Sequence, residues 1–405
     1  MYFSDESARE ASVVEGIDVY GVSHLAQVLD LVGGFGGVEA LKPVAAQNSG
    51  VPEAVHPHPD FSQVRGQVQA RRALEVAAAG GHNVLMSGPP GAGKTFMARC
   101  LPGILPPLTP EEAVETTRIW SVAGMPRGEA GLMSIRPFRA PHHTASVMSL
   151  TGGGSSAMPG EISLAHNGVL YLDELPEFPG RALEVLRQPL EDGTIQLSRV
   201  RYKVSYPARF MLVASMNPCP CGFRGHPTKE CVCTEYQVQR YRSRISGPLL
   251  DRIDIQLHVK PVELNDLIPG NNSPGEAGSS GSIRTRVGAA HAAVGESAAL
   301  VGLSGAFAES SAVIRCRVEK AREIQRERFC KLDGVYTNAH MDTDLLPRYC
   351  NLNTATQSFL KEAVSKLHLS ARSYHRILRL ARTIADLDGC SAIEIQHLAE
   401  AVQYK

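Results

Sequence analysis

The chain is 405 residues long, of which 43% are hydrophobic and 20% are charged, as in ordinary globular proteins. Lysine plus arginine and aspartate plus glutamate each number 41, so the net charge is zero and any surface for nucleic acid must be a local patch. The sequence has neither an apolar stretch long enough to cross a membrane nor a charged leader followed by an apolar run, and it predicts no membrane partner.

The first 60 residues predict little regular structure. Short helices are expected at 8–14 and 23–31, on either side of the apolar run Val19–Val22. Glycine and proline mark the rest of this segment as a linker. Because its apolar content is too thin for an independent domain, we interpret 1–60 as a remnant or an appendage.

From Phe61 onward the pattern becomes that of an α/β protein. A helix is predicted over Val68–Ala79 and is ended by two glycines. Apolar runs typical of buried strands follow, with helical segments between them, at Asn83–Met86, Gly168–Leu172, Phe210–Ala214 and Ile253–Val259. This alternation predicts a parallel sheet flanked by helices, as one domain over 61–267.

The remainder of the chain is predicted to be a linker followed by helices. Residues 268–282 are a low-complexity segment rich in glycine and serine. Residues 283–405 are expected to form a small all-helical domain. Its helices, recognised by apolar residues at helical spacing, are predicted at Val313–Arg328, Thr354–Leu367, Tyr374–Leu387 and Ile393–Val402.

The strongest motif lies between the first predicted strand and a helical segment. It is the phosphate loop G-x-x-x-x-G-K-[ST], formed by Gly88, Pro89, Pro90, Gly91, Ala92, Gly93, Lys94 and Thr95. Backbone N–H groups of such a loop surround the phosphates of ATP, Lys94 would reach the β- and γ-phosphates, and the Thr95 hydroxyl would bind Mg²⁺. A glycine-rich turn that fits by chance is the alternative, which the order strand, loop, helix disfavours.

Polar side chains follow two further predicted strands. Asp173 would hold Mg²⁺, and Glu174 would orient and deprotonate the attacking water. Asn217 would hydrogen-bond the γ-phosphate or that water, at the edge of the sheet where α/β proteins bind ligands. A solvated acidic loop, and a turn-forming asparagine before a proline, are the alternatives.

Two arginines would complete an ATP site shared between subunits. Arg252 is a candidate finger for the γ-phosphate held by a neighbouring subunit. Arg372 opens a C-terminal helix and is expected to contact the nucleotide held in its own chain. Surface arginines that only aid solubility are the alternative, and the otherwise complete phosphate site favours the functional interpretation.

Residues 61–402 resemble the magnesium-chelatase-like AAA+ ATPases, most closely the ComM/YifB type of bacterial DNA helicases. Matching segments occur in order along the chain: Val68–Gly81 with the phosphate loop, Leu101–Leu108, Arg139–Thr144, Pro159–His166, Arg244–Asp254 and Ala381–Leu387. The resemblance implies an AAA+ core, a helical lid and a homohexameric ring. It also implies that Lys94, Thr95, Asp173 and Glu174 are Walker residues, Asn217 sensor 1, Arg252 the trans finger and Arg372 sensor 2.

One departure from this family lies at the beginning of the chain. The family carries a Lon-like domain ahead of the ATPase core, and only a part similar to its last helix, strand and helix is found near residues 5–35. A truncated reading frame or an upstream start is therefore expected.

DNA contacts are expected on a hairpin before the third strand. Its second arm places Arg199, Arg201 and Lys203 on one face, because strand side chains alternate. By resemblance the hairpin projects into the ring's pore, where six copies would concentrate positive charge on the DNA backbone. An ordinary solvated strand face is the alternative. His142 and His143 are interpreted as part of a second pore-side insertion, since adjacent histidines seldom ligate one metal ion.

Four of the nine cysteines form two C-x-C pairs, Cys219 with Cys221 and Cys231 with Cys233. Four thiolates joined by a short loop would suit a structural Zn²⁺ and a reducing cytoplasm. Disulfide pairing or chance clustering are the alternatives. The loop leaves directly from Asn217, so a bound metal would fix the end of that strand.

These features together predict an ATP-hydrolysing ring motor that acts on single-stranded or branched DNA, as a branch-migration helicase in recombination or natural transformation. The residues predict the ATPase chemistry, whereas DNA as the substrate follows mostly from the resemblance. One alternative is a magnesium-chelatase-type motor subunit that remodels a protein partner, which the cysteine cluster and the segment Pro141–Thr144 disfavour. The other is a truncated ATP-binding fragment without productive assembly.

Overall fold

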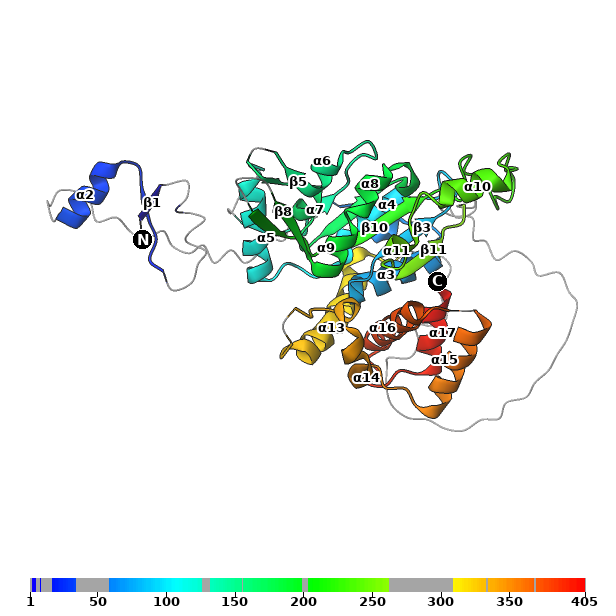
Figure 1. Cartoon of the computed structure of the whole chain (residues 1–405). Coiled ribbons are helices and arrows are strands. Elements are labelled where there is room, and N and C mark those ends of the chain that lie inside the picture. Colours follow the sequence, from blue (N-terminus) through cyan, green and yellow to red (C-terminus); the bar gives the residue numbers. More distant parts are fainter. Residues whose placement is uncertain are drawn as a thin grey trace, which may run out of the picture.

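A five-stranded parallel sheet forms the centre of the molecule (Figure 1). The computed structural model describes residues 2–4, 8, 17–33, 58–125, 132–154, 156–198, 203–261, 309–332, 334–367 and 369–404. The strands are β3 (Val84–Ser87), β4 (Phe138–Arg139), β7 (Val169–Leu172), β10 (Met211–Met216) and β11 (Ile255–His258). They lie in the order β11-β3-β10-β7-β4, which confirms the predicted α/β fold.

The order of the strands decides which chain segments meet. β3, β10 and β7 are neighbours and run parallel, so the segments that follow them leave the sheet at the same edge. These segments begin with the phosphate loop, Asn217 and Asp173. The fifth strand, β4, was missed by the sequence analysis because two residues are too short to make a periodic pattern.

Both faces of the sheet are buried. Along β10, Met211 and Val213 face one hydrophobic cluster, whereas Leu212 and Ala214 face another on the opposite side. Because neither face meets water, the strands are continuous apolar runs rather than alternating ones. The first face is covered by α3 (Val68–Gly80), α4 (Lys94–Cys100) and the C-terminal helices, and the second by α6 (Val147–Thr151), α7 (Glu161–Leu164), α8 (Gly180–Glu184), α10 (Glu235–Arg242) and α11 (Gly247–Leu250).

Helix α5 (Pro110–Val122) was not predicted, although its start carries a recognisable signal. Thr109 and Glu112 form a capping box, in which each side chain accepts a hydrogen bond from the other residue's backbone N–H, at 3.3 Å and 3.0 Å. Pro110 occupies the first turn, where its missing N–H has no cost. The sequence Thr-Pro-Glu-Glu therefore could have located this helix.

Short elements complete the core and the N-terminal part. The core also contains η1 (Phe61–Gln63), η2 (Leu101–Ile104), β5 (Gly152–Gly153), β6 (Met158–Pro159), η3 (Leu175–Glu177), α9 (Arg187–Asp192), β8 (Thr194–Ser198) and β9 (Lys203–Pro207). Near the N-terminus, β1 (Tyr2–Ser4) pairs with β2 (Tyr20–Val22), and α2 (Leu25–Gly33) lies where a helix was expected. Most of the helix expected at 8–14, and the linker 268–282, lie outside the described residues.

The described residues from 309 to 404 are helical, as predicted. They form α13 (Ser311–Phe329), η4 (Asn338–His340), η5 (Thr343–Leu345), α14 (Leu346–Tyr349), α15 (Thr354–Lys366), α16 (Ala371–Leu387) and α17 (Ile395–Gln403). α16 begins three residues earlier than expected, because Ser370 accepts a hydrogen bond from the N–H of Ser373 and so caps the helix. Within the part of the chain that the structure describes, no helix is long and apolar enough to span a membrane.

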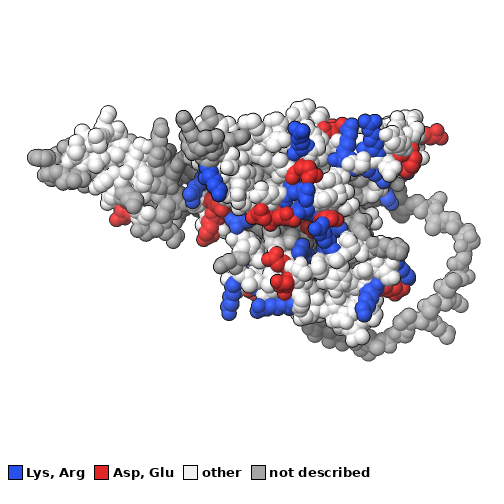
Figure 2. Space-filling model, in the orientation of Figure 1, with Lys and Arg blue, Asp and Glu red and all other residues white. Residues whose placement is uncertain are grey.

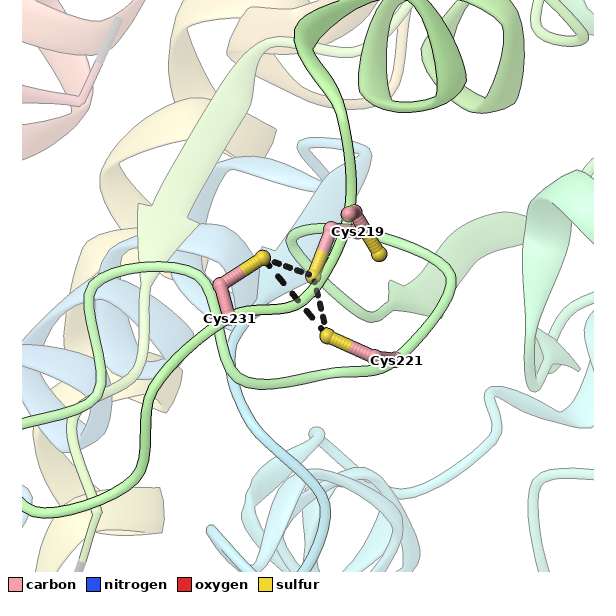
Figure 3. A group of neighbouring side chains, drawn as sticks. Cys219, Cys221 and Cys231 are labelled. Atoms are coloured by element: carbon pink, nitrogen blue, oxygen red, sulfur yellow. Dashed lines mark hydrogen bonds between the residues drawn. The ribbon is translucent and has the colours of Figure 1, made fainter.

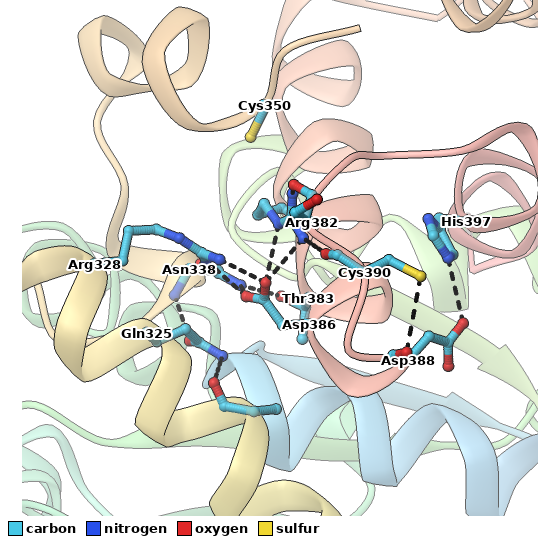
Figure 4. Close-up of polar contacts among 12 residues, drawn as sticks. Gln325, Arg328, Asn338, Cys350, Arg382, Thr383, Asp386, Asp388, Cys390 and His397 are labelled. Carbon is cyan, nitrogen blue, oxygen red and sulfur yellow. Dashed lines mark hydrogen bonds and ion pairs between the residues drawn. The ribbon is translucent and has the colours of Figure 1, made fainter.

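A buried carboxylate organises the packing of these helices (Figure 4). Asp386 of α16, which is 2% exposed, accepts hydrogen bonds from both terminal nitrogens of Arg328, at 2.7 Å and 2.6 Å. It also accepts from Asn338 at 2.8 Å and from Arg382 at 3.0 Å. The charge is thus satisfied from three elements at once, which ties α13 and η4 to α16.

The same polar network continues into the core. Thr383 accepts a hydrogen bond from Asn338 at 3.1 Å, and its hydroxyl lies 2.8 Å from Nε2 of the buried His82. Nδ1 of His82 lies 3.3 Å from the carboxylate of Asp254, which precedes β11. α16 is therefore joined to the sheet by directional contacts as well as by the apolar packing against α3.

Replacing Asp386 should loosen the helical part. Asp386→Asn keeps the volume but leaves Arg328 and Arg382 without a counter-charge in a buried site, so we expect a loss of at least about 3 kcal/mol in the free energy of unfolding. Urea unfolding followed by circular dichroism measures this change. The exposed Asp344→Asn is the matched control and should shift stability by less than about 0.5 kcal/mol. Equal losses in the two variants would contradict the role of Asp386.

Candidate functional site

The phosphate loop joins β3 to α4 and is connected to the neighbouring strand by a lysine. Gly93 has φ of 84° and caps α4 in the left-handed region, which favours glycine. Lys94 is 8% exposed, and its ammonium donates hydrogen bonds to the carbonyls of Gly88 (2.6 Å) and Pro89 (2.9 Å). It also donates to Oδ1 of Asn217 at 3.2 Å, which brings the end of β10 to the loop. Burial lowers the pKa of Lys94, against the opposing effect of two nearby carboxylates.

The end of β7 meets the other side of the loop. The Thr95 hydroxyl donates a hydrogen bond to Oδ2 of Asp173 at 2.8 Å, and the Tyr171 hydroxyl donates to Thr95 at 3.2 Å. Ser215 of β10 donates to Oδ1 of the same carboxylate. Burial favours the neutral acid, but the hydrogen bonds from Ser215, Thr95 and Tyr171 outweigh it and lower the pKa of Asp173. Asp173 therefore stays anionic beside a hydroxyl, as a hard cation requires of its ligands.

Glu174 is held in an uncommon conformation at the exposed side of this site. Its φ of 53° and ψ of 49° are left-handed, and its backbone N–H donates to Oδ1 of Asp173 at 3.0 Å. Such backbone geometry costs energy and is concentrated at functional sites. The Glu174 side chain is 50% exposed, so its carboxylate is accessible to water.

Sequence reasoning missed a partner of Glu174. Nδ1 of His143 lies 3.5 Å from Oε2 of Glu174, and the ring of His142 lies 4.1 Å from that of His143, centroid to centroid. His143 follows β4, which pairs with β7, so the two side chains come from adjacent strand ends. The sequence does not indicate this contact, because the two-residue strand β4, which brings His143 beside the end of β7, has no recognisable periodic pattern.

The two candidate arginines lie together. Arg252 forms an ion pair with Glu191 and donates to the Pro248 carbonyl at 2.6 Å. Arg372 donates to Oδ2 of Asp251, the residue before Arg252, at 2.9 Å. One turn further along α16, Arg376 donates to the carbonyls of Ile253 (2.5 Å) and Leu250 (3.3 Å) and so fixes the segment that carries Arg252.

Both arginines are remote from the phosphate loop of their own chain. The segment containing Arg252 enters β11 beside the start of β3, where Asp254 N–H donates to the Asn83 carbonyl at 3.1 Å. The phosphate loop leaves the other end of β3, and the distance from Asn83 to Gly88 along an extended strand is about 16 Å. The resemblance predicts Arg372 at the nucleotide of its own chain, whereas the structure places it beside Asp251 at the opposite end of the sheet.

The four cysteines of the two C-x-C pairs form one cluster (Figure 3). Their sulfur atoms all lie within 4.8 Å of one another, and all four cysteines are free. Cys219 Sγ lies 3.4 Å from Cys221 Sγ and 3.6 Å from Cys231 Sγ. With Zn–S bonds of about 2.3 Å, the sulfurs of a tetrahedral site lie about 3.8 Å apart, so the four thiols fit a zinc ion.

The candidate DNA hairpin is described in part. β8 and β9 form an antiparallel pair in which Ser198 faces Lys203, and the Lys203 side chain is exposed. Arg199 and Arg201 lie outside the described residues. The hairpin is therefore present where the sequence predicted it, and one of its three basic residues can be placed.

A sizeable cavity lies elsewhere in the part of the chain that the structure describes. It has a volume of about 550 Å³ and lies between α13 and the amino ends of β7 and β10. Three arginines of its wall have partners within the chain: Arg136 pairs with Glu112, Arg209 pairs with Glu115, and Arg322 donates to the carbonyl of Ala78 at the end of α3. The phosphate loop is not part of it.

Comparisons with known proteins cover nearly the whole chain. The family model described as magnesium chelatase, subunit ChlI, matches residues 60–267, and the model of the C-terminal part of that subunit matches residues 308–405. The competence protein ComM of Haemophilus influenzae is 42% identical over 411 residues, which cover 100% of this chain and 71% of that protein. YifB of Escherichia coli is 40% identical, covering 98% and 69%.

A more distant similarity reaches the chelatases themselves. The magnesium-chelatase 67 kDa subunit of Heliobacterium mobile is 28% identical over 194 residues, which cover 41% of this chain and 29% of that protein. The similarity to ComM and YifB is thus both higher and longer. The chain belongs to the magnesium-chelatase-like AAA+ ATPases, and within them to the ComM/YifB type.

Proposed function

We propose that this protein is an ATP-hydrolysing ring motor that acts on single-stranded or branched DNA, as a branch-migration helicase in recombination or natural transformation. The observation that carries the proposal is the hydrogen-bonded junction of three strand ends, in which Lys94 contacts Asn217 and Thr95 contacts Asp173. Residues 61–267 would form the ATPase core, and 283–405 the lid that follows the linker 268–282.

The junction supports the residue roles in hydrolysis. The loop Gly88–Thr95 would bind the phosphates of ATP, with Lys94 at the β- and γ-phosphates. Thr95 and the anionic Asp173 would hold Mg²⁺, which neutralises charge on the phosphate oxygens. Glu174, accessible and beside His143, would orient and deprotonate the attacking water, and Asn217 would hydrogen-bond the γ-phosphate.

A homohexameric ring would complete this site between subunits. Arg252 and Arg372 lie together at the end of the sheet opposite their own phosphate loop, which supports a role for both at the nucleotide of the next subunit. Their present partners are Glu191 and Asp251, carboxylates that a γ-phosphate would replace. Hydrolysis in one subunit would then change its contact with the neighbour.

Two observations support DNA as the substrate: the similarity to ComM and the basic residues of the β8–β9 hairpin. The Haemophilus influenzae relative is named a competence protein, which favours a process that handles incoming DNA. Arg199, Arg201 and Lys203 would line the pore of a ring. The face shown in Figure 2 adds little to this argument, because acidic and basic side chains are interspersed on it.

A magnesium-chelatase-type motor subunit that remodels a protein partner is the second candidate. The family description and the similarity to the Heliobacterium mobile subunit favour it. A fragment that binds ATP without productive assembly is the third candidate. The three differ in what stimulates hydrolysis.

The first experiment measures ATP hydrolysis with and without single-stranded or forked DNA. We expect DNA to stimulate hydrolysis and forked DNA to be unwound. Lys94→Ala should abolish nucleotide binding, whereas Glu174→Gln should bind ATP and lower turnover by at least about a hundredfold, because it removes a general base. Activation by a chelatase partner with no effect of DNA would overturn the proposal, and ATP binding without turnover would favour the fragment.

A mixing experiment tests the shared sites. Lys94→Ala subunits lack a working phosphate loop but keep both arginines, and Arg252→Ala subunits have the reverse defect. We expect each variant alone to be inactive and an equimolar mixture to recover about a quarter of the wild-type rate, since a quarter of randomly paired interfaces are complete. A mixture of Lys94→Ala with the double variant is the control. No recovery in the first mixture would rule out an intersubunit role for Arg252.

We also propose that Cys219, Cys221, Cys231 and Cys233 bind a structural Zn²⁺. The fit of their sulfurs to a tetrahedron supports this, and four protein ligands leave no open position for catalysis. A reducing cytoplasm, in which thiolates persist, is the compartment that such a site requires.

Metal analysis of the purified protein tests the zinc site. We expect stoichiometric zinc in the wild type and its loss in Cys221→Ser, because three thiolates no longer close the tetrahedron. Cys316→Ser is the matched control, since Cys316 is an exposed cysteine of α13 and should leave the zinc content unchanged. Wild-type protein without stoichiometric zinc would refute the assignment.

A further inference from the structure

We propose that the cysteine loop, residues 219–233, is a zinc-dependent support of the nucleotide site, and that Gly222 is the residue that transmits the support to the phosphate loop. The inference rests on the ATP and zinc sites proposed above and adds a connection between them. It assigns to Gly222 a positioning role, acting through Pro90 and Asn217.

The loop contacts the phosphate loop directly. A Cβ atom built on Gly222 would lie 2.8 Å from Cδ and 3.3 Å from Cγ of Pro90, and 4.0 Å from Cγ of Asn217. The first distance is shorter than real Cβ contacts, so the Gly222 backbone packs closely on the proline ring. Gly222 is buried, and its φ of 83° is left-handed, which is a second reason for glycine here.

The loop is also continuous with the residue that binds Lys94. Asn217 accepts the hydrogen bond from the Lys94 ammonium, and Pro218 alone separates it from Cys219. The Gly222 N–H donates to the Cys219 carbonyl at 3.0 Å, which turns the chain back toward Pro90. The cysteine loop is therefore connected to the nucleotide site in two ways. It is covalently linked to Asn217 through Pro218, and Gly222 packs against Pro90.

The contacts within the loop, apart from the cysteine cluster, are made by its less buried residues: Arg224 pairs with Glu235 at 2.7 Å, Lys229 lies over the Phe223 ring, and the backbone N–H of Thr228 donates to Nδ1 of His226 at 3.2 Å. Its second end is fixed by α10, in which Val238 and Tyr241 are buried. Between the two ends, Cys219 and Gly222 are the buried residues of 219–233. A segment without an apolar core gains its stability from cross-links. Exposed ion pairs such as Arg224–Glu235 contribute little, so a metal held by the four sulfurs would be the strongest cross-link of the loop.

The physical consequence is a dependence of ATP affinity on zinc. With the metal bound, the two C-x-C pairs are fixed to each other, and Gly222 is kept against Pro90. Without the metal, the loop gains conformational freedom, and the preorganisation of Pro90 and Asn217 is lost. Nucleotide affinity should fall because binding must then order these groups.

Two glycine variants test the contact. Gly222→Ala and Gly225→Ala both place alanine at a left-handed φ in the same loop, but a Cβ on Gly225 meets nothing within 4 Å. We expect both variants to retain zinc. The dissociation constant for the fluorescent nucleotide mant-ATP should rise about tenfold in Gly222→Ala and less than about twofold in Gly225→Ala.

Zinc removal and return test the metal dependence. A chelator should weaken mant-ATP binding by the wild type reversibly, and it should have a much smaller effect on Gly222→Ala, because coupled changes are not additive. Equal affinities of the two alanine variants, or wild-type affinity that survives loss of zinc, would overturn the inference.

The same measurements separate this inference from the proposals that it rests on. Absence of zinc from the wild type is a failure of the zinc site. Binding of mant-ATP that persists in Lys94→Ala is a failure of the phosphate-loop assignment. Neither result depends on DNA, so the DNA experiments can fail while the coupling between the cysteine loop and the nucleotide site stands.

Discussion

The hydrogen bonds that join the phosphate loop to the neighbouring strand ends are the interaction on which the rest of this structure depends. Lys94 contacts Asn217, and Thr95 contacts Asp173, only because β3 lies beside β10 and β10 beside β7. Parallel strands bring their carboxyl ends to one end of the sheet, where open α/β sheets bind their ligands. The fold therefore brings Lys94 and Asn217, which are 123 positions apart in the sequence, into contact in one polar site.

We propose a different role for the opposite end of the sheet. There Arg252 and Arg372 lie side by side, held by Asp251, Glu191 and the carbonyl contacts of Arg376. In a parallel sheet the carboxyl ends and the amino ends of the strands are separated by the length of the strands. One subunit could therefore bind phosphate at the carboxyl ends and present guanidinium groups at the amino ends. This polarity is what a head-to-tail ring requires.

Buried polar contacts link the helical part to this frame. Asp386 and His82 are satisfied by partners from the core and from three C-terminal elements, so their geometry specifies how α16 sits on the sheet. The cysteine loop, in contrast, has few buried apolar residues, and it contacts the nucleotide site through Gly222.

The sequence by itself determined the strand-like runs, the phosphate loop, the polar residues at the strand ends and the cysteine pairs, because each is written in local spacing or residue type. It also placed the C-terminal helices, whose apolar periodicity is local. Only the tertiary structure decided that His143 lies beside Glu174, that Arg372 accompanies Arg252, and that Gly222 packs on Pro90. These contacts depend on strand order and on a two-residue strand that no periodic pattern reveals, so local information could not have found them.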